Sequence, residues 1–326
     1  VPGSHYFNTP EGARIERELP LVTPAGTVTI ANYDLWHRAM PNTSDQNRYM
    51  VKFLFARMTE PRAPAWNNQH GAWPGIGPAL PDDGPELQSM YAHVWRWHRG
   101  ERSNTAPESS EGPISAHLRT LSAADERAGI AAAYEIAALG EAAIGGLIDL
   151  LGDDAEMTRR HAGYALSAIG APAVAALAEA LSHPTAATRT DAATILGDIA
   201  LDALAAAPAL IAATRDPHEE VRRSAAEALG TICPAAPDPV AALIDALGDA
   251  HSSVRTAATF ALCRLGPRAA EAISALEQVL DDENRYVRAD ALYALERIGT
   301  PQAKDTLIKH LMPARWCPLT TPESTF

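Results

Sequence analysis

The second half of this sequence repeats itself with a period of roughly 30 residues, and this period limits the possible folds more than any other feature. Each unit has an anchor residue at the expected end of its first helix, with alanine eight residues earlier and larger apolar residues four and one residues earlier. This spacing predicts an apolar stripe along one helix face. The anchors are Gly140, Gly170, Ala200, Cys233, Gly266 and Gly299.

A short turn, often with proline, and a second amphipathic segment follow each anchor. Such a helical hairpin cannot bury its apolar face alone, so neighbouring hairpins must stack. We therefore predict an α-solenoid of about six hairpins over residues 121–312, right-handed or gently curved.

Charged residues recur with the same period. Five of the six units carry arginine eleven residues before the anchor, namely Arg159, Arg189, Arg222, Arg255 and Arg288. Aspartates stand at the preceding helix ends, as at Asp216, Asp249 and Asp282. We interpret this as a ladder of ion pairs between repeats rather than a row of ligand-binding residues.

The pattern D-x-x-x-x-V-R-x-x-A-x-x-A-L, clearest at 249–262 and 282–295, resembles HEAT repeats and the HEAT-like repeats of phycobilisome lyases. The resemblance implies a solenoid that binds another protein. Deoxyhypusine hydroxylase is also built of HEAT-like repeats, with His-Glu pairs that bind iron. Here Ser224-Ala225 stands at that position, so a di-iron site is not expected. We expect the remaining histidines of the repeats to be solvated: His161, His183, His251 and His310.

Residues 1–60 have a different pattern. Short alternating segments at 27–30, 33–40 and 48–55 are separated by Gly, Pro and Asn turns. This is typical of antiparallel strands, so we predict a partial β domain.

Three motifs in this part carry a second resemblance: VPGSH at 1–5, GTV at 26–28, and LWHRAMPN at 35–42 followed by NRY at 47–49. Together they resemble the C-terminal half of the phytanoyl-CoA dioxygenase family, Fe(II)- and 2-oxoglutarate-dependent oxygenases on a double-stranded β-helix, or jelly roll. The resemblance implies that His37 is the distal iron ligand and that Arg48 grips the 2-oxoglutarate carboxylate. Imidazole suits iron, and guanidinium binds carboxylate bidentately.

The sequence departs from that family at one point. The other two iron ligands belong to a His-x-Asp motif before the PGSH turn, and this sequence contains no His-x-Asp. We therefore expect it to start inside the catalytic domain, with no complete catalytic set and no tight binding of iron or 2-oxoglutarate. The small-molecule substrate of the parent oxygenase stays open.

Residues 61–120 are rich in proline and glycine and predict a linker with one short helix at 87–100. We expect the aromatic residues of this helix to cover the exposed edge of the β domain or to dock it to the next domain. Residues 313–326 predict a disordered tail.

Charge and composition limit the partners. The formal net charge is −13, of which residues 121–326 carry −12. Such an acidic surface repels phosphate backbones, so nucleic acid is not expected as a partner. We predict no membrane span, and three cysteines without metal-type spacing indicate a reducing, cytoplasmic setting. The sequence does not open with a basic and then apolar signal peptide, and a signal before residue 1 stays open. Two functions stay open: an oxygenase fragment on a HEAT scaffold, or a non-enzymatic HEAT adaptor with a vestigial β segment.

Overall fold

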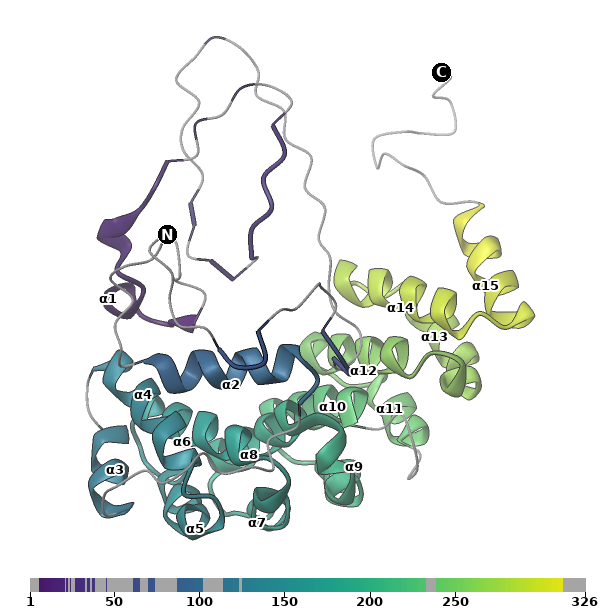
Figure 1. The fold of residues 1–326 in the computed structure, drawn as a ribbon. Coiled ribbons are helices and arrows are strands. Elements are labelled where there is room, and N and C mark those ends of the chain that lie inside the picture. The colour runs from purple at the N-terminus through teal and green to yellow at the C-terminus, as the bar shows by residue number, and fades with distance from the viewer. Residues whose placement is uncertain are drawn as a thin grey trace. The chain divides into compact units, whose positions relative to one another are not determined.

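The computed structural model describes residues 6–20, 22, 24, 27–32, 34–35, 37–38, 45, 61–64, 70–73, 87–101, 114–122, 125–232 and 239–312. The chain divides into two compact units, the first of residues 1–143 with 153–168 and the second of residues 144–152 with 169–326. Within the described ranges all regular structure is helical, which confirms the mainly α prediction (Figure 1).

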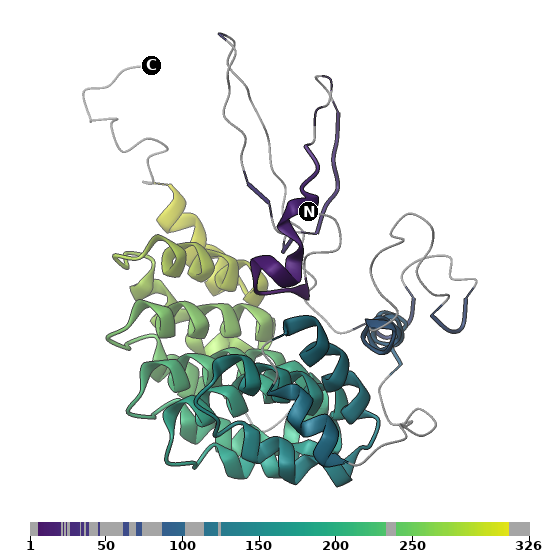
Figure 2. The same ribbon diagram turned by 90° about the vertical axis from the view of Figure 1, so that its left-hand side faces the viewer.

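In the second unit the first helices of successive hairpins stack side by side. They are α8 (Ala186–Ile199), α10 (Glu219–Ile232), α12 (Ser252–Leu265) and α14 (Arg285–Ile298). Each contacts the next, so they form one row of the solenoid (Figures 1 and 2).

Shorter helices form the other row of the second unit. They are α7 (Val174–Ala180), α9 (Ala207–Ala213), α11 (Val240–Ala246), α13 (Ile273–Val279) and α15 (Pro301–Leu311). The first four each pack against the first helix that follows them. Three 3-10 segments enter this row, at Ala171–Ala173, Ala200–Ala206 and Gly266–Ala272.

The predicted apolar stripe forms the core between the rows. In the second unit the leucines four residues before the anchors are fully buried: Leu196, Leu229, Leu262 and Leu295. The equivalent Leu166 of the first unit is fully buried too. The alanines eight residues before the anchors are buried as well. The helices approach closely at Gly230. A Cβ added at Gly230 would lie 2.7 Å from the Cα of Ala261, so only glycine fits there.

The anchors end the first helices by a change of backbone conformation. Positive φ angles occur at Gly140, Gly170, Ala200, Gly266 and Gly299. Glycine adopts this conformation without steric cost, whereas a Cβ is strained in it. Ala200, with φ 59° and ψ −131°, therefore adopts a glycine conformation. Cys233 lies outside the described residues.

The first unit contains α1 (Pro10–Ala13), a 3-10 turn at Ile15–Arg17, α2 (Gln88–His98), α3 (Ile114–Leu121) and α4 (Glu126–Ala137). It also holds α6 (Glu156–Ile169) up to residue 168, while α5 (Glu141–Leu150) spans the boundary between the units. The helix expected at 87–100 is confirmed as α2, which packs against α4.

One core joins the N-terminal segment to these helices. Its buried members are Phe7, Ala13, Leu87, Met90, Ile130 and Ala131. The carboxylate of Glu126, itself 4% exposed, accepts hydrogen bonds from the backbone N–H of Asn8 at 2.7 Å and of Thr9 at 3.0 Å. The Thr9 hydroxyl donates to the same carboxylate at 2.6 Å. Glu126 therefore holds residues 6–13 on α4.

The β domain expected for residues 1–60 is not found in the part of the chain that the structure describes. No strand is formed at 27–30, and Val28 and Ile30 are 85% and 95% exposed. Alternation of apolar residues does not make a strand without a partner, so the half-buried strand expected there is wrong. The strand expected at 48–55 lies outside the described residues, and so does the tail at 313–326.

By length and composition, the helical stretch Ala186–Ala213 is apolar enough to cross a membrane, which differs from our prediction of no span. It consists of α8, a 3-10 segment and α9. Its apolar residues Leu196 and Leu210 are fully buried in the solenoid, as in the core helices of other proteins. This composition therefore reflects packing between repeats.

Candidate functional site

The structure describes only one of the two residues predicted for the oxygenase site, His37. His37 is exposed, and its Nδ1 lies 2.6 Å from the carbonyl oxygen of Leu35. Arg48 lies outside the described residues, so its position relative to His37 stays a prediction. Across the described ranges, no group of three or more His, Cys, Asp or Glu side chains could hold a metal ion. The role of His37 as an iron ligand therefore stays a prediction as well.

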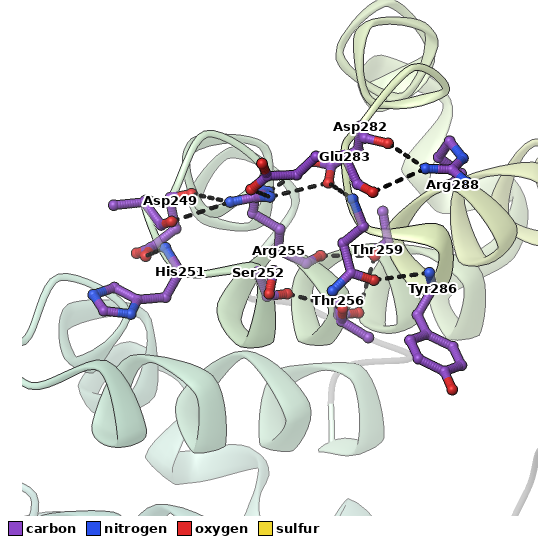
Figure 3. Close-up of polar contacts among 12 residues, drawn as sticks. Asp249, His251, Ser252, Arg255, Thr256, Thr259, Asp282, Glu283, Tyr286 and Arg288 are labelled. Carbon is purple, nitrogen blue, oxygen red and sulfur yellow. Dashed lines mark hydrogen bonds and ion pairs between the residues drawn. The ribbon is translucent and has the colours of Figure 1, made fainter.

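The predicted ladder of ion pairs is confirmed for three of the five arginines, Arg189, Arg222 and Arg255. We expected each arginine to pair with the aspartate at the preceding helix end, but each of the three pairs with the aspartate 27 residues later, through two hydrogen bonds in the bidentate geometry that favours guanidinium over ammonium. No aspartate stands 27 residues after Arg159 or Arg288. For Arg255 and Asp282 the two distances are 2.7 Å from Nε and 3.0 Å from Nη2 (Figure 3). The equivalent pairs are Arg189–Asp216, with distances of 2.7 and 2.9 Å, and Arg222–Asp249, with distances of 2.6 and 3.0 Å.

Each arginine also binds the turn that precedes its own helix. Nη1 of Arg255 donates to the carbonyl oxygens of Asp249 at 2.9 Å and Ala250 at 3.2 Å (Figure 3). The aspartate in turn accepts the N–H two residues later, as Asp282 does from Asn284 at 2.7 Å. One guanidinium therefore ties two successive turns together.

Electrostatics support a charged ladder. Burial raises the pKa of Asp249, but hydrogen bonds from Arg222 and from the His251 N–H outweigh it and hold the pKa below its ordinary value of 3.8. The Arg255 hydrogen bond is the largest influence that lowers the pKa of Asp282. The ladder side chains are thus ionised and fully occupied with one another, which is a structural role.

A second set of arginine contacts was not foreseen. Nε of Arg264 donates to the carbonyl oxygen of Gly230 at 3.1 Å, and Nε of Arg297 donates to that of Cys263 at 3.0 Å. Both arginines stand two residues before their anchors, a periodic signal that the sequence carries only in its last two units. They hold the C-terminal ends of α10, α12 and α14 together.

The expectation that His161 is solvated is wrong, because its side chain is fully buried in the first unit. Its Nδ1 lies 3.0 Å from the carbonyl oxygen of Leu121, and its ring fills the space beside Gly129. A Cβ at Gly129 would overlap this ring. Gly129 occupies the position of the ladder arginine in its own unit, so the missing side chain makes room for the imidazole.

The residues six positions before the anchors differ in burial between the two units. They are Tyr134, Tyr164, Thr194, Glu227, Phe260 and Tyr293. In the first unit Tyr134 and Tyr164 pack against the core formed with Phe7. The Tyr134 ring also lies 5.3 Å from that of His93 in α2, measured between centroids.

In the second unit the same position is exposed to solvent. Phe260 on α12 is 39% exposed and Tyr293 on α14 is 60% exposed. Tyr286, on the first turn of α14, is 57% exposed, and its ring points away from the ladder (Figure 3). We define Phe260, Tyr286 and Tyr293 as the aromatic patch.

Family comparisons agree with the repeat geometry. The model of HEAT repeats matches residues 174–263 and 240–315, and the model of the PBS lyase HEAT-like repeat matches residues 158–183. Residues 158–315 carry HEAT repeats. The matched HEAT repeats include the three ladder pairs and the aromatic patch, and no curated protein matches the sequence.

Several solved structures are similar to the chain. One is the complex of CpcE and CpcF of phycocyanin lyase from Nostoc sp. PCC7120, with 28% identity, a TM-score of 0.43, and coverage of 47% of this chain and 98% of that chain. Another is a computationally designed armadillo repeat protein for modular peptide recognition, with 19% identity, a TM-score of 0.39, and coverage of 57% and 99%. A third is YIBA_ECOLI, with 19% identity, a TM-score of 0.47, and coverage of 63% and 80%.

Proposed function

We propose that the HEAT repeats of the second unit are a scaffold that binds another protein through the face of α12 and α14. The observation that supports this most directly is the aromatic patch, where three large apolar side chains are exposed together on neighbouring repeats. Aromatic residues are enriched at the centres of protein interfaces, and grouped exposure is unusual on a surface that contacts only water.

The paired ladder supports the same proposal. Its charged side chains are internal to the solenoid, with side-chain exposures of 8 to 15% in the three pairs. They stabilise the spacing of the helices and leave recognition to the residues on the open face. A rigid array that presents a repeated surface is the usual way in which solenoids bind extended partners.

Site-specific photocrosslinking tests this function. A photoreactive phenylalanine analogue placed at Phe260 or Tyr293 is expected to capture a partner protein, whereas the same analogue at Glu179, exposed on α7, is not. The captured protein is then purified and its complex reconstituted. The double change Phe260→Ala and Tyr293→Ala is expected to weaken that complex about tenfold or more. Unchanged affinity, or equal capture from Glu179, would reject the scaffold face.

A second candidate rests on the motifs around His37 and Arg48, which favour a fragment of an Fe(II)- and 2-oxoglutarate-dependent oxygenase. We expect this chain to release no succinate from 2-oxoglutarate and Fe(II) above a His37→Ala control. Release above that control would favour the oxygenase and identify a small-molecule hydroxylation as the activity to pursue.

A further inference from the structure

A carboxylate stands within the aromatic patch without a basic partner. Asp290 lies on α14 and is half-buried. Among the described residues it takes part in no hydrogen bond or ion pair, unlike the ladder aspartates, and burial raises its pKa. A half-buried carboxylate that lacks compensation costs free energy, which a cation supplied from outside would offset.

The neighbours of Asp290 along α14 are aromatic. Tyr286 and Tyr293 stand four residues before it and three residues after it, so the three side chains share one helix face. The tyrosines are both more than half exposed, and the carboxylate lies between them along the ridge.

Phe260 joins this group from the preceding repeat. The register is shown by Thr194 and Ser224, whose hydroxyl oxygens are 3.2 Å apart between α8 and α10. Thr194 holds the repeat position of Phe260, and Ser224 holds that of Asp290. By the same register between α12 and α14, we infer that Phe260 lies beside Asp290.

The nearby cations already have other partners. Arg285 lies over the Tyr286 ring, 4.7 Å from its centroid, and donates to its hydroxyl at 2.7 Å. Arg297 donates to the carbonyl oxygen of Cys263. The carboxylate of Asp290, flanked by aromatic rings, is therefore open to an incoming guanidinium or ammonium group, which both aromatic faces and a carboxylate attract.

The first unit indicates which kind of segment covers this repeat position. Tyr134, the equivalent of Tyr293, packs against the core that α2 helps to form. The helix α2 (QSMYAHVWRWH) is aromatic, contains Arg96 and two histidines, and has no acidic residue. Its aromatic side chains complement the rings of the aromatic patch, and its basic side chains complement the carboxylate of Asp290.

We propose that the partner of the second unit presents a basic, aromatic amphipathic helix, and that one of its arginine or lysine side chains pairs with Asp290 between Phe260, Tyr286 and Tyr293. This inference rests on the scaffold function proposed above and names the chemistry of its partner. Asp290 supplies the charge preference, and the rings supply the apolar contact area.

The test uses the full chain and a synthetic peptide with the sequence of residues 87–100, labelled for fluorescence anisotropy. We expect the peptide to bind, and a peptide with Arg96→Glu and Arg99→Glu not to bind. In the protein, Asp290→Asn is expected to weaken binding about fivefold or more, and Tyr293→Ala by a similar factor. Glu179→Gln removes an exposed carboxylate from α7 and is expected to leave binding unchanged.

Several results would overturn the proposal: no binding of the basic peptide, equal binding of both peptides, or equal affinity of the wild type and Asp290→Asn. Sedimentation of the protein over increasing concentration tests a second copy as the occupant, and a dimer that Tyr293→Ala dissociates would also overturn it. If crosslinks at Tyr293 persist and Asp290→Asn has no effect on the reconstituted complex, the scaffold function stands and the basic helix is wrong.

Discussion

The two units treat the same repeat position in opposite ways. Tyr134 and Tyr164 in the first unit pack against a core that residues 6–13 and α2 help to form, while Phe260 and Tyr293 in the second unit are exposed. The difference teaches that the repeat position does not by itself determine burial, because in the first unit the covering residues come from segments outside the repeat.

The contacts between repeats also differ. The second unit uses arginine–aspartate pairs, which are polar and recur from one repeat to the next. The first unit replaces one ladder arginine by Gly129 and fills the space with the neutral ring of His161. Four experiments test whether this comparison is physically meaningful.

The largest effect is expected from Gly129→Ala. A methyl group there overlaps the buried His161 ring, so we expect the free energy of unfolding to fall by about 2–4 kcal/mol, despite the better helix propensity of alanine. Chemical denaturation measures the loss. Gly145→Ala on α5, where nothing lies within 4 Å of the added Cβ, is the matched control and should be neutral or stabilising. Equal effects of both changes would show that His161 does not occupy the space beside Gly129.

Breaking one ladder pair in the second unit comes next. Arg222→Ala leaves the nearly buried Asp249 without its bidentate partner, which should cost about 2–3 kcal/mol. The control is Arg215→Ala in the pair Arg215–Asp245, whose side chains are 66% and 65% exposed. There we expect less than about 0.5 kcal/mol because solvent screens the pair. Comparable losses at both sites would contradict the distinction between ladder and surface pairs.

The two units should lose stability in different pH ranges. Burial, with the Arg96 charge, lowers the pKa of His93 from 6.5 to about 4, and burial also lowers the pKa of His161. Both imidazoles are neutral in the folded first unit, so their contribution is complete above pH 6.5 and is lost as the pH falls from 6.5 towards 4. We expect about 1–2 kcal/mol, reduced by partial solvent access.

The ladder aspartates have a pKa below 3.8, so the contribution of the second unit persists above that value and falls only at lower pH. Hydrogen exchange at pH 5, corrected for intrinsic rates, should show weakened protection in α4 and unchanged protection in α10 and α12. An equal loss of protection in both units near pH 5 would show that the two units do not differ in their pH dependence.

The smallest effect concerns the anchors. Gly266 has φ 57 and ψ −128, close to the backbone conformation of Ala200. Ala200→Gly places glycine in this conformation, and relief of strain should raise stability by about 1 kcal/mol. Gly266→Ala should lower it by a similar or larger amount. Thermal unfolding of the two variants measures both shifts, and a destabilising Ala200→Gly would show that Ala200 contributes more through packing than it costs in strain.

Much of the repeat region could be predicted because its signals are local. Anchors, apolar stripe and ladder arginines recur at fixed offsets, and α-helical geometry converts those offsets directly into faces. The burial of His161 and the function of Glu126 could not be predicted in this way. The contact between Asn8 and Glu126 joins residues 118 apart, and no period relates them.

The sequence by itself determined that the second half is a stack of helical hairpins held by arginine–aspartate pairs, because a helical period and a charge at each turn leave no other efficient way to bury the apolar faces. Only the tertiary structure decided which face of those hairpins is covered. Residues 6–13 and α2 help to bury Tyr134 and Tyr164, while Phe260, Tyr286 and Tyr293 are exposed around an unpaired Asp290. Burial depends on what lies across a surface, and neighbours along the chain do not specify it.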